Sequence, residues 1–287
     1  MISALIVDNL FLVFSIVVAM CSVEIGAHLI VSIRLLGSVG IRARLRECYH
    51  ILMATQFANM ITPFKAGIPI RIFLYKRIFL LDPKMGVGIV FVETILLLLA
   101  VSIIGTVGVA LFFVDRSVLG LASLVVIVIF SMATLAILSI LLRRIDVQGI
   151  SNGYFRRVLL FSQNLFNSLA SLDLRISSLV TGLFVISLLA QGLRLSIVLG
   201  FFSVSTTPLE LTCALAIAYT AGAVSMLPFG LGARDGTLAF LLLGSGMDAG
   251  GITIAVLAQR VFSPGMYLML GVYSYYFLFR SVQSSPE

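Results

Sequence analysis

Long apolar runs separated by short polar segments follow one another along the whole chain. The uninterrupted runs cover about residues 10–33, 84–113, 117–142, 176–203 and 248–279. Each is long enough for a membrane-spanning helix, which needs about 20 apolar residues. Two further segments, 45–81 and 207–246, each hold two shorter apolar stretches interrupted by proline and glycine. Because proline removes a backbone donor and kinks a helix, we expect each segment to be a helical hairpin, either re-entrant or fully spanning.

Composition agrees with this pattern. Hydrophobic residues make up 60% of the 287-residue chain and charged residues 11%, and the mean hydropathy is +1.17. These values exclude an ordinary soluble domain and predict an all-α polytopic membrane protein with one transmembrane domain over 1–287. The formal charge of +7 belongs to loops at an anionic membrane surface, so we expect no nucleic-acid partner.

The arginines of the short loops predict the orientation, because cytoplasmic loops are enriched in Lys and Arg. Arg34, Arg42, Arg44 and Arg46 follow the first run, and Arg280 follows the last. The loops near 114–116 and 203–210 carry few basic residues. We therefore expect a plasma-membrane protein with its N-terminus outside and its C-terminus inside. The 45–81 hairpin then opens from the cytoplasm and the 207–246 hairpin from the exterior.

The segment 143–175 is expected to be a cytoplasmic linker. Arginines 143, 144, 156 and 157 lie in it, and apolar residues recur at helical spacing from Phe155 to Leu172. This pattern is typical of an amphipathic helix at the membrane interface, or of a surface helix packed on the bundle.

The two broken segments resemble each other. ITPFKAG (61–67) aligns with MLPFGLG (226–232), which pairs Pro63 with Pro228 and Gly67 with Gly232. Three full spans separate the copies, so they are expected to be inverted in the membrane, with half-repeats at 1–142 and 176–287. Broken helices at matching positions of inverted halves indicate a transporter's binding site. Pro63, Gly67, Pro228, Gly230 and Gly232 are the expected break residues.

Charged residues in or beside these elements form the candidate substrate site. At 1.5 Å per residue, Glu93 lies about 15 Å and Arg260 about 18 Å into their spans, near the bilayer midplane. A charge there needs a partner or a watery cavity. The full candidate set is Lys65, Arg71, Glu93, Arg234, Asp235 and Arg260. Its four cations against two anions, beside helix N-termini, favour a phosphate-like head group.

A second interpretation of the same charges is structural. Glu93–Arg260 and Arg234–Asp235 would then be ion pairs that lock the two halves together. Arg194 and Glu24 also lie within apolar runs, and we rank them behind the six candidates because their depth is less central. Asp235 is expected to hold Arg234 or to cap the helix that follows.

The motifs carrying these residues resemble one known family. TPFKAGIPIRIFLYKR, the later Glu93, PFGLGARDG and Arg260 are similar to the lysylphosphatidylglycerol synthase transmembrane-region family, also called flippase-like domain proteins. Asp235 replaces the family's usual glutamate, and Ile68 stands where an acid is common. The resemblance covers about residues 20–279 and lacks one N-terminal span usual in the family. It identifies the chain as a stand-alone member without the synthase domain.

The resemblance implies lipid translocation. In fused members this region flips aminoacylated phosphatidylglycerol, and stand-alone members are linked to polyprenyl-phosphate or glycolipid pathways. The expected function is therefore a translocase for an anionic lipid of either type, with the head group bound at the midplane between the hairpins. A lipid-biosynthetic enzyme is a possible partner, and the oligomeric state stays open.

The rival functions are a membrane-embedded enzyme or subunit of lipid-linked glycan synthesis, and a scaffold without lipid handling. An enzyme would need paired carboxylates, a metal cluster or a histidine base. The sequence has no DxD, DDxxD or P-loop motif, and Cys21, Cys48, Cys213, His28 and His50 are scattered. We therefore expect no catalytic residue, metal or cofactor. Without an ATP site, active transport would need an ion gradient, with Glu93 or Asp235 as a conceivable proton carrier.

Overall fold

The computed structural model describes residues 2–62, 66–108, 173–225 and 230–283. This part of the chain is all-helical. The expected linker helix and the expected span at 117–142 lie outside the described residues.

Three long helices are apolar enough to cross a membrane. They are α1 (Ile2–Ser38), α4 (Pro83–Gly108) and α7 (Leu174–Phe201). Each lies over an apolar run of the sequence, so these three expected spans are confirmed, with Leu10–Ser38 as the spanning part of α1.

The two broken segments each form a pair of shorter helices that pack on each other. The first pair is α2 (Leu45–Ile61) with α3 (Gly67–Phe79), and the second is α8 (Pro208–Val224) with α9 (Ala233–Gly244). The breaks have local causes. Thr62 is extended, with φ −116° and ψ 144°, because a residue before proline disfavours the helical region. Gly232, at φ +81°, ends the second break and precedes α9.

The last expected span, 248–279, is not one helix. The chain forms α10 (Ala249–Arg260), a five-residue π-helix η5 (Val261–Gly265) and α11 (Met266–Gln283). Pro264 lies inside η5 and has no backbone N–H, so the regular hydrogen-bond ladder cannot run through it. The prediction of an unbroken helix was therefore wrong at this proline.

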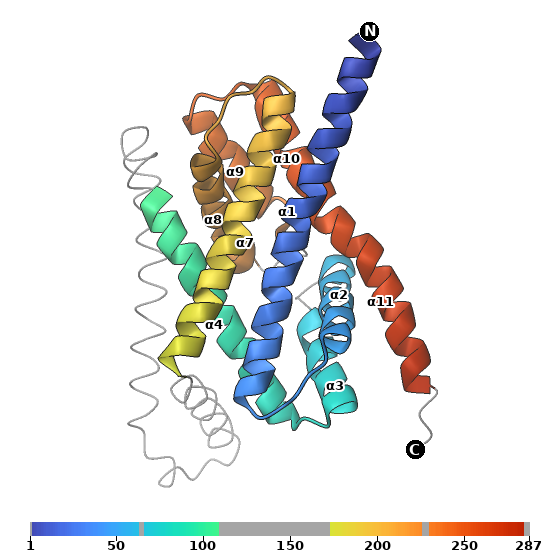
Figure 1. Cartoon of the computed structure of the whole chain (residues 1–287). Helices are drawn as coiled ribbons and strands as arrows, with labels where there is room; N and C mark the ends of the chain where they lie inside the picture. The colour runs from blue at the N-terminus through green and yellow to red at the C-terminus, as the bar shows by residue number, and fades with distance from the viewer. Residues whose placement is uncertain (1, 63–65, 109–172, 226–229, 284–287) are drawn as a thin grey trace.

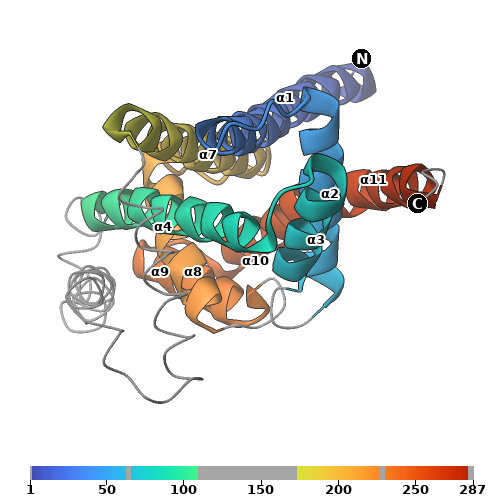
Figure 2. The ribbon, with the colours of Figure 1, turned by 90° about the horizontal axis from the view of Figure 1, so that it is seen from below.

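The helix pairs lie towards opposite ends of the molecule, with α8 and α9 in the upper half of Figure 1 and α2 and α3 in the lower half. The start of α1 and the end of α11 also lie at opposite ends. Figure 2 shows α4 between α7 on one side and α8 on the other, as their mutual packing requires. The long helices thus connect the two ends of the bundle.

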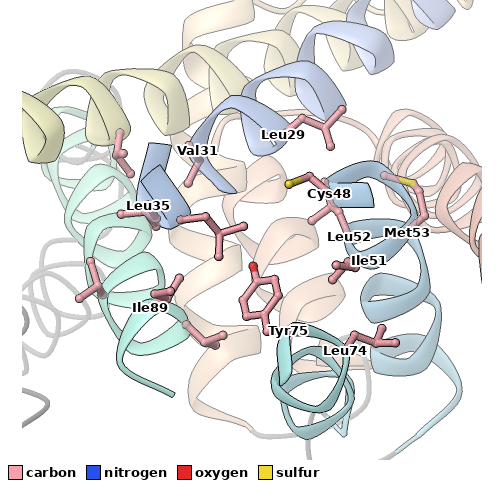
Figure 3. Close-up of a cluster of buried hydrophobic side chains, with 14 of the residues drawn as sticks. Leu29, Val31, Leu35, Cys48, Ile51, Leu52, Met53, Leu74, Tyr75 and Ile89 are labelled. Carbon is pink, nitrogen blue, oxygen red and sulfur yellow. The ribbon is translucent and has the colours of Figure 1, made fainter. Parts of the chain in front are cut away.

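The buried apolar side chains form two clusters, one around each helix pair. The α2 cluster joins α2 and α3 to the second half of α1, the first half of α4 and part of α11. Figure 3 shows part of this cluster, where Ile51, Leu52 and Tyr75 lie in the space between α1, α2 and α3. The α8 cluster joins α8, α9 and α10 to α7 and the second half of α4. Each helix pair is therefore fixed by its own cluster of buried apolar side chains.

Candidate functional site

The first candidate ion pair is Arg71 of α3 with Glu93 of α4. Arg71 Nη1 donates to Glu93 Oε1 at 3.0 Å. Nη2 lies 2.7 Å from Oε2, an ion-pair contact outside hydrogen-bond geometry. The two side chains are only 7% and 11% exposed. The pair therefore joins α3 to α4 in a nearly dry interior.

Two further contacts occupy the rest of the Arg71 guanidinium. Its Nε donates to the Tyr75 hydroxyl at 2.7 Å, one turn along the same helix, and its Nη2 donates to Ser32 Oγ of α1 at 2.9 Å. All three nitrogens thus donate to a partner within the protein. In this state Glu93 balances the charge of the guanidinium, and each of its three nitrogens is engaged by a partner within the protein.

The second candidate ion pair is Asp235 of α9 with Arg260, the last residue of α10. Arg260 Nε donates to Asp235 Oδ1 at 2.9 Å, and Nη2 donates to Oδ2, which gives a two-point contact between the two planar groups. Asp235 Oδ2 also accepts from the backbone N–H of Gly232 at 3.3 Å, so it caps α9. With side chains 22% and 26% exposed, this pair is wetter than the first.

Arg234, next to Asp235, is arranged differently. Its guanidinium lies over the ring of Tyr219 in α8, with Cζ 4.9 Å from the ring centroid. Nε and Nη2 are shielded from solvent, and neither has a hydrogen-bond partner among the described residues. Tyr219 and Arg234 both lie within electrostatic range of Glu24. Arg234 is a cation at the first turn of α9 whose buried donors lack an acceptor.

Two glycines bring the backbone to this arginine. Gly230 has φ +65°, and a Cβ placed on it would lie 2.8 Å from Gly222 Cα and 3.1 Å from Arg234 Cβ. Gly222 belongs to α8, so the chain after the break lies directly against the helix before it. The sequence predicted Gly230 as a break residue, and its contact with Gly222 was missed.

A third ion pair lies deepest in the molecule. Arg194 of α7 is 1% exposed, and its Nη1 donates to Glu24 Oε2 of α1 at 2.9 Å. The Tyr267 hydroxyl of α11 donates to Glu24 Oε1 at 3.1 Å. The sequence ranked Glu24 and Arg194 as less central, yet they join three helices at a fully buried position. The sequence signal for this contact was one charged residue of opposite sign in each of two apolar runs, Glu24 in the first and Arg194 in 176–203.

The structure therefore pairs the predicted residues differently from the structural interpretation of the sequence. Glu93 holds Arg71 and not Arg260, because α3 turns back along α4. Asp235 holds Arg260 and not Arg234, and its expected capping of α9 is present. Among the described candidates, Arg71–Glu93 and Asp235–Arg260 are two ion pairs that share no residue. Lys65, Pro63 and Pro228 lie outside the described residues.

Tyrosines and a serine complete these contacts, and they were missed in the sequence. Tyr75, Tyr219, Tyr267 and Ser32 each contact one of the charged groups above. The spacing of four residues between Arg71 and Tyr75 was a usable signal, since such pairs share a helix face. Within the described ranges, no three metal-ligating side chains gather at one place.

The comparison with known families agrees with this architecture. A family model described as the lysylphosphatidylglycerol synthase TM region matches residues 6–271. No curated protein matches the chain significantly. The matched description is that of a membrane region, as the three long apolar helices require.

Proposed function

Because the chain belongs to the lysylphosphatidylglycerol synthase TM region family, we propose that it translocates an anionic, phosphate-bearing membrane lipid. The lipid is of the polyprenyl-phosphate-linked or phosphatidylglycerol type. Its head group binds at Arg234, between the helix pairs, while its chains stay in the surrounding bilayer.

The observation that carries this proposal is the free edge of Arg234. Nε and Nη2 form one side of a guanidinium, with donors spaced for two oxygens of a carboxylate or phosphate. Arg260 uses the same two nitrogens to bind the carboxylate of Asp235. In Arg234 these nitrogens are buried and lack a partner among the described residues. An unpaired buried charge is costly, so an anionic ligand with two oxygens is the group that this edge fits.

The surroundings of Arg234 favour the same ligand. Arg234 is the second residue of α9, where unpaired backbone N–H groups and the helix dipole favour negative charge. Four buried or half-buried arginines, at positions 71, 194, 234 and 260, face three carboxylates, at 24, 93 and 235. The excess of one positive charge in this set belongs to Arg234.

The position of the helix pairs supports the transport route. We infer that the two halves are inverted repeats and that each break gives the head group access from one membrane side. The element order is the same in both, a long helix followed by a 17-residue helix and a helix of 13 or 12 residues. The pairs lie towards opposite ends of the bundle in Figure 1.

Surface charge supports the proposed orientation. The exposed cations Arg42, Arg44, Lys76, Arg77 and Lys84 lie at the end of the bundle that carries α2 and α3. Basic residues face the cytoplasm in membrane proteins. We therefore place α2 and α3 towards the cytoplasm and α8 and α9 towards the exterior of a plasma membrane.

An enzyme of lipid-linked glycan synthesis is the weaker alternative. General acid–base chemistry needs a carboxylate or histidine that is free to exchange a proton with substrate. Glu24, Glu93 and Asp235 each hold an arginine. The described carboxylates near Arg234 are thus engaged in structure, whereas the arginine is available for binding.

The test is lipid flipping by the purified chain in liposomes, with a polyprenyl phosphate and with phosphatidylglycerol. Arg234→Gln removes the two-point contact and is expected to slow flipping of the substrate lipid about 10- to 100-fold, the loss of one charge-assisted interaction. The matched control is Arg77→Gln, which changes an exposed arginine of α3. Equal flipping by wild type and Arg234→Gln would remove the binding site, and no flipping of either lipid would contradict the translocase.

A further inference from the structure

The interior face of α1 carries an unusual row of polar side chains. Cys21, Glu24, His28 and Ser32 recur every three or four residues, which places them on one face of the helix. Cys21, Glu24 and Ser32 are buried, and His28 is half-buried. A polar row facing the inside of a membrane bundle is expensive to keep, so it indicates a function.

Two ion pairs hold the ends of this row. Glu24 binds Arg194, whose Nη1 also lies 3.0 Å from Cys21 Sγ. Ser32, eight residues further on, accepts from Arg71, which holds Glu93. Eight residues of helix span about 12 Å. His28 lies midway, one turn from Glu24 and one turn from Ser32, and so stands between two carboxylate–arginine pairs that belong to different helices.

Among the described residues, no hydrogen bond engages the ring nitrogens of His28. The ring packs edge-on against Phe184 of α7, with centroids 5.4 Å apart. Glu24 and Glu93 both lie within electrostatic range of it. The charged groups within electrostatic range of His28 are Glu24 from α1, Arg71 from α3 and Glu93 from α4. Behind them, Arg194 of α7 and Tyr267 of α11 contact Glu24, and Tyr75 of α3 contacts Arg71.

Among these groups, an imidazole is the one suited to exchange a proton near neutral pH. The arginines stay charged, and tyrosines titrate far above neutrality. Glu24 and Glu93 each form an ion pair with an arginine. A histidine that only filled space against Phe184 would not need to lie in a row that links two carboxylates.

We propose that His28 is a proton-binding site that links Glu24 and Glu93, and that its proton crosses the membrane together with the anionic head group. A proton from water on one side bonds to a ring nitrogen of His28, and the same N–H bond breaks when the proton returns to water on the other side. No oxidant, reductant or metal takes part.

The second clause of this proposal rests on the translocase function proposed above. Moving a net charge against the membrane potential costs free energy. A head group with one negative charge that moves with one proton crosses without net charge. The proton site therefore gives a chain without an ATP-binding motif a source of energy, namely the proton gradient.

The experiment uses the two histidines of the chain as a matched pair, since the sequence contains only His28 and His50. His50 lies in α2, where its ring stacks on Phe277 at 4.1 Å and its Nδ1 lies 3.1 Å from Ser274 Oγ. His28→Gln and His50→Gln each remove one imidazole. The full-length wild type and both variants are reconstituted in liposomes with an imposed pH gradient, and lipid flipping and lumenal pH are followed together.

In wild type and His50→Gln, the gradient is expected to speed flipping at least about 5-fold and to dissipate with the lipid. In His28→Gln, flipping is expected to continue at the rate seen without a gradient, and the lumenal pH to stay constant. Flipping that responds equally to the gradient in His28→Gln would overturn the coupling.

A direct titration separates this proposal from the translocase function. Imidazole proton resonances of the purified chain, assigned with the two variants, should show a pH-dependent shift of the His28 signal over the pH range in which the protein stays folded. A His28 resonance that does not change over this range would overturn the proton site. If no lipid moves in any protein, the translocase fails and takes the coupling with it, while the titration still decides the proton site.

Discussion

The pairs α2–α3 and α8–α9 are built alike but hold their charges differently. In each pair, the second helix is joined to the next helix of the chain by an arginine–carboxylate contact. In the first pair, α3 supplies the arginine and α4 the carboxylate; in the second, α9 supplies the carboxylate and α10 the arginine. The polarity of the contact is reversed.

The environments of the two contacts also differ. Arg71 donates from all three nitrogens to partners inside the protein, and its pair is nearly dry. Asp235–Arg260 is about a quarter exposed, and beside it Arg234 has buried donors without a described partner. A fully occupied contact holds helices in place, whereas an incomplete one can bind a ligand. We therefore propose that the first pair is the fixed half of the site and the second the binding half.

The largest expected effect comes from breaking the fixed half. Glu93→Gln leaves the Arg71 guanidinium charged and buried without its counter-charge, which costs about 3–5 kcal/mol. We expect a large fall in the melting temperature of the protein in detergent, measured by thermal unfolding.

A double variant shows whether this loss comes from the lone charge. Arg71→Met combined with Glu93→Leu removes both partners and is expected to recover most of the stability, since apolar replacement of a buried pair is often neutral. A double variant as unstable as Glu93→Gln would contradict this account.

The next largest effect concerns the close approach inside the first helix pair. A Cβ on Gly67 would overlap the carbonyl oxygen of Thr55, and Gly67 N also donates to Asn59 Oδ1 at 2.9 Å. Gly67→Ala should therefore destabilise by about 1–3 kcal/mol through overpacking. Gly182→Ala, in a helix position with open space around it, is the control and should leave the melting temperature unchanged or raise it. Equal melting temperatures for both variants would contradict overpacking at Gly67.

A smaller loss of stability is expected in the binding half. Asp235→Asn weakens a partly exposed ion pair and a helix cap, which together contribute about 1–2 kcal/mol. Lipid flipping should fall by more than this loss of stability explains, because Arg260 then loses its carboxylate partner and competes with Arg234 for the head group. Measuring melting temperature and flipping on the same preparation tests this contrast. A stability loss as large as that of Glu93→Gln, with normal flipping, would reverse the roles of the two halves.

The smallest effect is expected for Tyr75→Phe. The variant removes one hydrogen bond to Arg71 and keeps the ring in the α2 cluster, so the cost is about 0.5–1.5 kcal/mol. Flipping should match wild type, because Tyr75 belongs to the fixed half. A variant that melts like wild type but flips lipid slowly would place Tyr75 in the binding half.

The sequence predicted the elements better than their contacts. Long apolar runs are sufficient to locate α1, α4 and α7, and proline with glycine locates the two breaks, because these signals are local. The partner of Glu93 is not a local property: it depends on how α3 turns back along α4. The contact of Glu24 with Arg194 joins residues 170 positions apart, and its depth could not be judged from the ends of the apolar runs.

Pro264 is a local signal of a helix break that the hydropathy pattern does not reveal. A proline inside an apolar run predicts a break as surely at 264 as at 63 and 228, yet hydropathy alone made 248–279 look continuous. The linker helix, Lys65 and the inverted relation of the two halves stay predictions.

The π-helix at Val261–Gly265 separates two helices, α10 and α11, that pack on different parts of the molecule. Before it, α10 packs on α7 and α9; beyond it, α11 packs on α2, where a Cβ on Gly271 would overlap Phe57. One continuous segment therefore packs on the binding half through α10 and on the fixed half through α11. A tilt of one half against the other would bend this segment at the π-helix, because Pro264 lacks the backbone N–H of a regular helical residue and so offers less resistance to bending.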